Sequence, residues 1–210
     1  MLNKAGVDAA MAIEQQDDYP LFPLGSVLFP GGRLALRIFE RRYLDLVTQT
    51  LREQGSFGIV YLHAGSEVAG AGDAQRLAAV GCEANIVDWD QTEDGLLGVV
   101  VEGGRRFRLD YSYRDDSGLQ RGRVQWLEEP EDVPLPETTE ELAALLAQLV
   151  EHPHVQRMGF SADVNGAGEL VNRLAQLLPL DAADVYPLLE VDDPLARLDA
   201  LHMLLDGLSL

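Results

Sequence analysis

The sequence predicts an α+β fold, in which a barrel-like sheet comes first and a small helical bundle follows. Two patterns carry this prediction. Before residue 130, apolar and polar residues alternate in short segments, which is the period of half-buried strands. After that point, leucines recur three and four residues apart, which is the period of amphipathic helices. The segment between the two parts, Glu128–Thr139, holds three prolines and several acids, and we interpret it as a linker.

Length and composition agree with one globular unit built from two parts. The chain has 210 residues, of which 47% are apolar and 24% are charged, as in an ordinary globular protein. A chain of this length can bury a core without disulfides or structural metals. We expect a loosely ordered N-terminus over residues 1–17, a β-rich barrel subdomain over 18–130 and a helical bundle subdomain over 131–210.

The first strands come from an apolar stretch, Pro20–Tyr43, that prolines interrupt. Pro20 and Pro23 fit a sheet edge or the start of a strand, where a missing N–H can face solvent. Pro30-Gly31-Gly32 predicts a chain reversal, because proline fixes φ and glycine accepts a positive φ. The alternation in Arg33–Phe39 predicts a strand with its arginines on the face opposite its leucines.

One helix and further short strands complete the β-rich part. Tyr43, Val47 and Leu51 share one face of a helix predicted over Glu40–Gln54, with Gly55 as its stop. Loops are expected at Gly65–Gln75 and at the tight hairpin Thr92–Gly95. The predicted strands are Phe57–His63, Ala78–Asp90 with a possible bulge at Gly81, Leu96–Gly103, Arg105–Arg114 and Gly122–Glu129. About six short strands and one early helix predict a closed or nearly closed barrel.

The second part reads as helices separated by prolines. A stripe of leucines from Leu142 to Leu149 predicts one helix, which His152-Pro153 ends. A second stripe from Leu170 to Leu178 ends at Pro179. Asp181 can cap a short third helix, and Asp193-Pro194 is a good N-cap and N1 pair for the last one.

Charge and residue counts argue against several classes of function. The formal charge is −19, so a nucleic-acid partner is not expected, because nucleic-acid binders carry a basic surface. Lys4 is the only lysine, and no Gly-Lys-Ser/Thr nucleotide loop or usable Ser-Lys pair exists. Cys82 is the only cysteine, and His152 with His154 cannot fill a zinc shell. We expect no catalytic residues, no cofactor and no metal.

The ends of the chain and its hydropathy bear on location. The N-terminal residues lack an apolar signal-peptide core, and no apolar run approaches the roughly 20 residues that span a bilayer. A single cysteine fits a reducing compartment. We therefore expect a cytoplasmic protein without a membrane partner.

Three segments together resemble a known family. They are "PLFPLGSVLFPGGRLALRIFERRY", "DGLLGVVVEGGRRFRL" and "LLPLDAADVYPLLEVDDPLARLDALHMLL". In this order they resemble the N-terminal, substrate-binding domain of the Lon proteases, over roughly Asp18 to Leu208. Arg41 stands where that family often has a proline that would help to start the helix. Full Lon proteases continue into ATPase and Ser-Lys peptidase domains, so the chain is expected to be a stand-alone N-terminal domain.

The resemblance implies a fold and a function. The fold is a PUA-like pseudo-barrel followed by the helical bundle. The function is non-catalytic binding of unfolded or degron-bearing protein segments, in an apolar groove between barrel and bundle or by strand addition at a sheet edge. Two alternatives stay open. PUA-like barrels elsewhere bind RNA, and a pocket with convergent polar groups would indicate a small-molecule enzyme.

The candidate peptide-binding residues cluster in the first of these segments. They are Phe29, Pro30, Arg33, Arg37, Glu40, Arg41, Arg42 and Tyr43. Phe29-Pro30 is either an exposed apolar lip or part of a simple chain reversal. The arginines are either a basic patch for an acidic peptide or a solvated face that pairs with the acidic helical half. Arg105, Arg106 and Arg108 form a second cluster with the same two interpretations.

Overall fold

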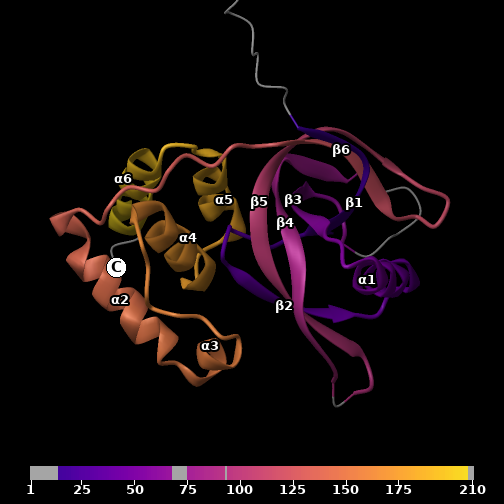
Figure 1. The fold of residues 1–210 in the computed structure, drawn as a ribbon, viewed down its shortest axis with the longest axis horizontal. Coiled ribbons are helices and arrows are strands. Elements are labelled where there is room, and N and C mark those ends of the chain that lie inside the picture. Colours follow the sequence, from indigo (N-terminus) through magenta and orange to yellow (C-terminus); the bar gives the residue numbers. More distant parts are fainter. Residues whose placement is uncertain (1–13, 68–74, 93, 208–210) are drawn as a thin grey trace, which may run out of the picture.

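The computed structural model describes residues 14–67, 75–92 and 94–207, and it confirms the predicted α+β class. A barrel lies in the middle, with the helical bundle on one side and α1 on the other (Figure 1). The strands are β1 (Gln15–Leu24), β2 (Arg33–Ile38), β3 (Phe57–Ala64), β4 (Arg76–Gln91), β5 (Leu97–Arg114) and β6 (Gln120–Trp126). The α-helices are α1 (Arg41–Glu53), α2 (Glu140–Val150), α3 (Pro153–Arg157), α4 (Ala167–Leu177), α5 (Ala182–Glu190) and α6 (Pro194–Gly207), and a 3₁₀ turn (Glu137–Thr139) precedes α2.

The sheet closes through its longest strand. The strand order is β2-β5-β4-β3-β1-β6, and an added β5–β6 pairing closes the ring. The second half of β5 pairs with β6, from Phe107 opposite Trp126 to Arg114 opposite Gln120. The first half pairs with β2, from Arg33 opposite Glu102 to Ile38 opposite Leu97. In the described residues β2 pairs with β5 alone, so its other edge is free.

The sequence divides β5 into two strands, and this is wrong, because the strand runs unbroken through Gly103 and Gly104. Gly103 is where the turn after β1 crosses β5. A Cβ atom on Gly103 would lie 2.0 Å from the carbonyl oxygen of Phe29, so only glycine allows this approach. Gly103 also exchanges backbone hydrogen bonds with Gly31 and Gly32, each 2.8 Å long. The glycines therefore mark a crossing of two chain segments, and the strand does not end there.

The prolines of β1 are not at an edge of the sheet as expected. β1 pairs with β3 on one side and with β6 on the other. Pro20 is paired with Arg121 of β6, just before the pairing with β3 begins at Leu21. Pro23 is paired with Val60 of β3, beyond the last residue paired with β6. Each proline thus has a strand partner on one side only. A missing N–H is tolerated at such a position, because the other side has no strand to bond.

Barrel and bundle share one hydrophobic core. One cluster joins Phe29 and Phe107 of the barrel to Leu146, Leu174 and Leu201 of the bundle, and all five are fully buried. A second cluster lies under α1, on the other side of the barrel. The division at residue 130 remains a prediction, as does the loose N-terminus. β1 begins at Gln15, and residues 1–13 lie outside the described part.

Two of the predicted N-caps differ: Asp193 caps α6 with its side chain, whereas Asp181 precedes α5 without a side-chain cap hydrogen bond. The Asp193 carboxylate accepts the N–H of Ala196 at 2.7 Å, which confirms the predicted cap of α6. His152-Pro153 ends α2 as predicted, and it also starts α3, with His152 as the N-cap. α1 ends one residue earlier than expected, because Gln54 and not Gly55 adopts the left-handed conformation, with φ +52°.

The predicted linker is docked onto the bundle. The Asp132 carboxylate accepts the N–H groups of Gly168 at 2.8 Å and Glu169 at 2.9 Å, in the first turn of α4. The neighbouring carbonyl of Val133 accepts the N–H of Ala167 at 2.9 Å. These bonds satisfy donors that α4 itself leaves open, and the negative charge of Asp132 complements the helix dipole. The predicted linker therefore binds to the start of α4 and does not only connect the barrel to the bundle.

Arg106 also joins the barrel to the bundle. The prediction that its side chain belongs to a solvated face is wrong. Its side chain is fully buried, with a relative exposure of 0%. The guanidinium donates to the carboxylates of Glu129 at 2.6 Å and Asp192 at 3.0 Å. It also donates to the carbonyl of Leu189, in the last turn of α5, at 2.8 Å and to that of Val191, just after the helix, at 3.2 Å. The same interpretation also has these arginines pair with the acidic helical half, and this part holds for Arg106, which pairs with Asp192.

Candidate peptide-binding groove

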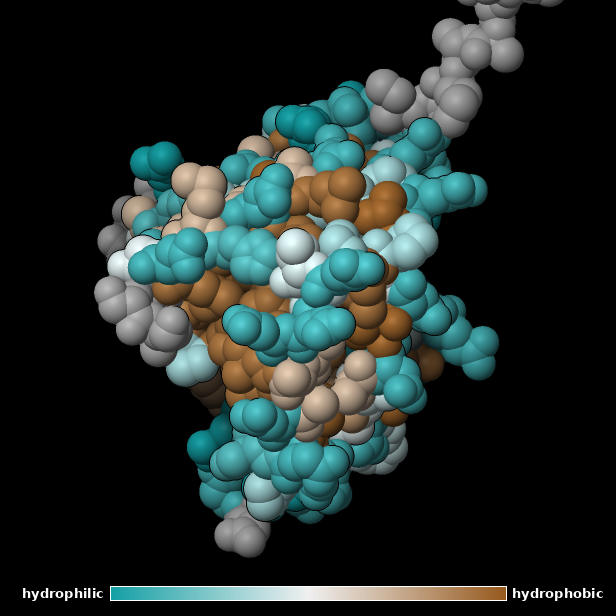
Figure 2. Space-filling view, turned by 90° about the vertical axis from the view of Figure 1, so that its left-hand side faces the viewer, coloured by the Kyte–Doolittle hydropathy of each residue, from teal (hydrophilic) through white to brown (hydrophobic). Residues whose placement is uncertain are grey.

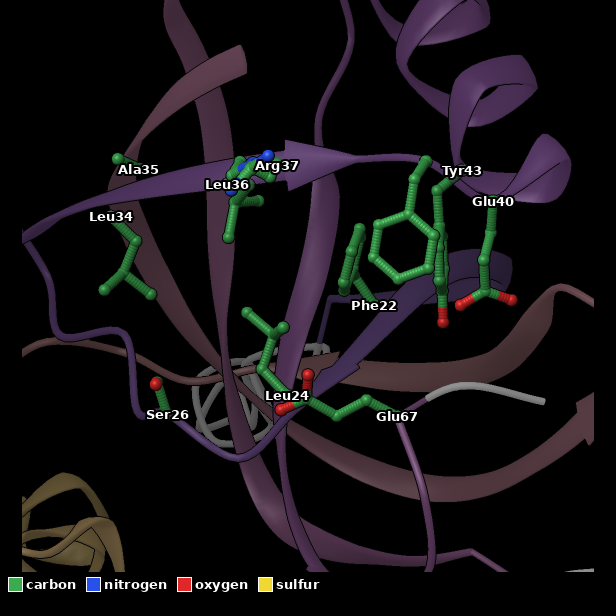
Figure 3. Close-up of a pocket in the computed structure, with 11 residues that line it drawn as sticks. Phe22, Leu24, Ser26, Leu34, Ala35, Leu36, Arg37, Glu40, Tyr43 and Glu67 are labelled. Atoms are coloured by element: carbon green, nitrogen blue, oxygen red, sulfur yellow. The ribbon is translucent and has the colours of Figure 1, made fainter. Parts of the chain in front are cut away.

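The most relevant cavity lies on the barrel beside β2 and has a volume of about 250 Å³. β2, the end of β1, the start of α1 and the residue Glu67 surround it (Figure 3). We call it the β2 groove. Its lining residues are Phe22, Leu24, Ser26, Leu34, Ala35, Leu36, Arg37, Phe39, Glu40, Tyr43 and Glu67.

The walls of the β2 groove combine apolar side chains with polar groups in similar proportion. Leu34 and Leu36 point from β2 toward Leu24, whereas Ala35 points to the other side of the strand (Figure 3). The ring of Tyr43 stacks on Phe22, with centroids 3.9 Å apart and an angle of 17° between the planes. This stack brings the first turn of α1 against β1 and gives the groove a rigid aromatic wall.

Phe39 completes the apolar surface at the end of β2. Its side chain is 57% exposed, although it is large and aromatic. Folding leaves this ring in contact with water at the entrance of the cavity, where contact with a ligand would remove apolar area from solvent.

One end of the groove is polar and tightly organised. Arg42 is buried and forms an ion pair with Glu40 at 3.0 Å. It also donates to the carbonyls of Gly118 at 2.9 Å and Glu67 at 3.0 Å. These bonds fix the two glutamates beside the cavity, since Arg42 joins the start of α1 to the end of the segment that follows β3.

The hydroxyl of Tyr43 is the unusual group of the site. It is buried and has no hydrogen-bond partner among the described residues. Burial raises the pKa of Tyr43 to about 12, so the phenol is neutral at physiological pH. Because the oxygen atom is buried, a ligand in the groove does not reach it.

Phe29 and Pro30 do not form an exposed lip. Phe29 is fully buried in the shared core, and its N–H donates to the side-chain oxygen of Gln176 at 3.1 Å. Gly32 donates to the carbonyl of Phe29 at 2.8 Å, and Gly31 has φ +70°. Pro30 and Gly31 therefore occupy the central positions of a tight turn, as the chain-reversal interpretation predicts.

The arginines of the segment do not form a free basic patch either. Each of them has a carboxylate partner in the described structure. The pairs are Arg33 with Glu102, Arg37 with Asp94, Arg41 with Asp45, and Arg42 with Glu40. Arg33 also donates to the carbonyl of Met158 at 2.6 Å, which ties β2 to the bundle. Arg41 is on the outer face of α1 and lies away from the groove lining.

Of the eight predicted residues, Arg37, Glu40 and Tyr43 line the β2 groove. Sequence reasoning selected a segment that borders this groove and favoured its charged members over its apolar ones. The lining residues that it did not name are Phe22, Leu24, Ser26, Leu34, Ala35, Leu36, Phe39 and Glu67. The available signal was Phe39, a large aromatic residue placed just beyond the last apolar position of the strand.

The groove predicted between barrel and bundle has a mixed lining. A cavity of about 280 Å³ lies there, beside the N-terminus of α4. Its charged groups are Glu129, Asp132, Glu169 and Asp192 around the buried Arg197. Burial and the nearby Arg106 lower the pKa of Arg197. Most of the exposed surface of the cavity is apolar, and prolines from three segments contribute to it, whereas Arg197 and Asp132 already hold the helices of the bundle.

A second apolar surface lies on the bundle. Figure 2 shows apolar atoms gathered on the face formed by the helices, with hydrophilic residues around them. α6 exposes Leu195 and Met203, the latter to 75%. The half-buried leucines of α2, α4 and α6 include Leu145, Leu149, Leu177, Leu204 and Leu205.

The described residues contain neither a cluster of metal ligands nor a membrane-spanning helix. No group of three or more His, Cys, Asp and Glu side chains is placed to hold a metal ion. Within the same residues, no helix combines the length and the apolar character needed to cross a membrane.

Comparison with known proteins identifies relatives of this chain. A family model described as the ATP-dependent protease La (LON) substrate-binding domain matches residues 18–207. A Lon protease of Cytophaga hutchinsonii is 25% identical over 198 residues, which are 89% of this chain and 24% of that protein. The chain thus spans about a quarter of the length of this relative.

Solved structures agree on the fold. The crystal structure of a Lon N-terminal domain protein from Xanthomonas campestris is 37% identical, with a TM-score of 0.68. The match covers 91% of this chain and 98% of that one. The N-terminal domain of a Mycobacterium avium complex Lon protease has a TM-score of 0.59 at 18% identity, covering 92% of this chain and 97% of that one. At this identity, the second match supports the fold alone.

Proposed function

The chain belongs to the family of LON substrate-binding domains, and on this premise we propose that it is a non-catalytic module that binds unfolded or degron-bearing segments of other proteins. The family name supplies the substrate class, and the β2 groove supplies a place for it. The observation that carries the proposal is the exposed Phe39 at the entrance of the cavity. Unfolded chains expose apolar side chains, and such a site can take them up.

The mechanism is insertion of one or two apolar side chains of the client beside the Phe22–Tyr43 stack. Glu40 and Glu67 at the polar end would contact the flanking parts of the client. An RNA ligand is not proposed, because the arginines beside the groove are paired with carboxylates and the chain carries a charge of −19. We also propose a cytoplasmic location, which the free and buried Cys82 supports.

A binding experiment with matched variants tests the proposal. Reduced and alkylated lysozyme, which cannot refold, is titrated into the protein and followed by fluorescence anisotropy. We expect binding that Phe39→Ser weakens by about tenfold, since burying a phenylalanine ring on binding contributes about 1.5–3 kcal/mol. Phe39 is exposed, so its replacement leaves the fold intact.

The control variant is Met203→Ser, which removes the most exposed apolar side chain of α6. It is expected to bind as the native protein does. Weakening by Met203→Ser alone would move the site to the surface in Figure 2. Absence of binding by the native protein, at concentrations that saturate known binders of unfolded chains, would refute the proposed function.

A further inference from the structure

The free edge of β2 runs along the groove. Gly103 donates its N–H to the carbonyl of Gly32 at 2.8 Å, so this pair lies at a hydrogen-bonded position of the β2–β5 ladder. Hydrogen-bonded and non-hydrogen-bonded pairs alternate in an antiparallel ladder. The next bonded residues are then Leu34 and Leu36, and the backbone groups of Ala35 and Arg37 are directed away from β5.

These outward groups have no strand partner in the described structure, because β2 pairs with β5 alone. Ala35 and Arg37 both belong to the lining of the β2 groove. Their side chains are exposed on the face opposite to Leu34 and Leu36. The cavity therefore offers a row of backbone donors and acceptors next to apolar side chains. This is the combination that binds an extended peptide as an additional strand.

The geometry of an added strand determines which side chains enter the groove. Residues directly opposite each other in neighbouring strands point to the same face. Alternate residues of the peptide would then lie on the face of Leu34 and Leu36, above Phe22 and Leu24. A large apolar residue at every second position fits this arrangement, and the residues between them face solvent.

The charge around the groove favours a cationic peptide. Glu40 is paired with Arg42, and Asp94 is paired with Arg37, so the carboxylate of Glu67 is the excess charge beside the groove. The rest of the molecule adds to the same sign, with 35 acidic and 16 basic residues.

We propose that β2 binds an extended, positively charged client segment as an additional strand, with every second, apolar residue of that segment placed in the β2 groove. This inference rests on the proposed function and specifies the form of its ligand. It predicts that the peptide backbone, and not only its side chains, is recognised.

N-methylated peptides test the backbone contact directly. The probe is a fluorescein-labelled peptide in which phenylalanine and lysine alternate, titrated against the full chain. One derivative carries N-methyl groups on its lysines and the other on its phenylalanines. In an antiparallel added strand the lysine N–H groups face Ala35 and Arg37, so lysine methylation should weaken binding by about tenfold or more. Phenylalanine methylation should have little effect. The reverse asymmetry would indicate a parallel strand and also support the proposal.

A protein variant gives a second measurement. Ala35→Pro removes the outward N–H of β2. Proline is tolerated on an edge strand where its missing N–H faces solvent. We expect Ala35→Pro to weaken peptide binding by about tenfold, while the control Met203→Ser, on α6 and outside the groove, binds as the native protein does. If Ala35→Pro does not fold, as judged by circular dichroism, the methylated peptides decide alone.

The outcomes separate the two proposals. Equal affinity of both methylated peptides would overturn strand addition and leave the proposed function standing. Failure to bind either the peptide or unfolded lysozyme would overturn both. A dimer that Ala35→Pro dissociates would also overturn this inference, because the β2 edge would then belong to a second copy. A glutamate-for-lysine peptide that binds equally well would refute the charge argument.

Discussion

Replacing Arg106 with methionine should destabilise the whole protein, because Arg106 joins the barrel to the bundle. Arg106→Met retains much of the length and apolar stem of the side chain and removes the guanidinium. The change leaves the carbonyl of Leu189 without its buried donor. The carbonyl of Val191 keeps two bonds from Arg197, at 3.0 Å and 2.7 Å. The main loss is therefore one buried acceptor and two ion pairs.

The magnitude follows from the exposure of the partners. Breaking a buried ion pair by removing one partner costs about 3–5 kcal/mol when the remaining charge stays buried. Here the side chains of Glu129 and Asp192 are 34% and 70% exposed, so both carboxylates can be hydrated after the change. The buried carbonyl of Leu189 costs about 1–3 kcal/mol when it is left unsatisfied. We therefore expect a loss of about 3 kcal/mol, at the low end of the range.

Urea unfolding followed by circular dichroism measures this loss, and calorimetry should show a decrease in Tm of roughly 6–12 °C for a protein of this size. Arg108→Met is the matched control, since Arg108 lies two residues further along β5 with an exposed side chain. It should change the free energy of unfolding by less than about 0.5 kcal/mol. If the two variants had equal stability, Arg106 would not be a structural link, and the reasoning from its four bonds would be refuted.

Three further changes test other features. Asp132→Ala removes the cap of α4 and should lower the free energy of unfolding by about 1 kcal/mol in urea titrations. Amide exchange in the first turn of α4 should become faster. Unchanged exchange would contradict the capping role. Burial alone would raise the pKa of Asp115, but hydrogen bonds from Ser117, Arg121 and Leu119 lower it from 3.8 to about 2. The carboxylate therefore stabilises the fold above pH 4, and this contribution disappears as the pH falls toward 2. The Tm difference between the native protein and Asp115→Asn should shrink over that range, and a constant difference would argue against the ionised carboxylate. Tyr43→Phe removes a buried hydroxyl without a partner, so the free energy of unfolding should stay equal or rise by about 1 kcal/mol; a loss of more than 1 kcal/mol would reveal a missed bond.

The fold could be predicted largely because its local patterns are strong, and the errors have a common cause. Alternation in the second half of β5 places Arg106 and Phe107 on opposite faces, and the sequence assigns Arg106 to solvent. Both side chains are buried, because here β5 has the barrel interior on one side and the bundle on the other. An alternation with a period of two residues shows which side chains share a face of a strand. It does not show which of the two faces is buried by a helix that lies far away in the sequence.

The candidate site shows the same limit in another form. The segment from Phe29 to Tyr43 contains part of the groove, yet its arginines were weighed as the ligand-binding groups. The partners of Arg33 and Arg37 lie 69 and 57 residues away, so these two pairings could not be seen in the sequence, whereas the partners of Arg41 and Arg42 are local. From the sequence, Phe29 is likewise expected to be an exposed loop residue, but in the structure the helices of the bundle bury it. Long-range contacts decide both questions.

The shared core has a consequence for how this chain can be divided. Phe29 and Phe107 contact the same cluster as Leu146 and Leu174, and Asp132 and Arg106 add polar ties across the junction. A protease that cuts the connecting segment would therefore leave two fragments that stay bound to each other. Separately expressed halves should likewise reassemble, and neither half could be transplanted alone into a fusion protein without exposing a large apolar face.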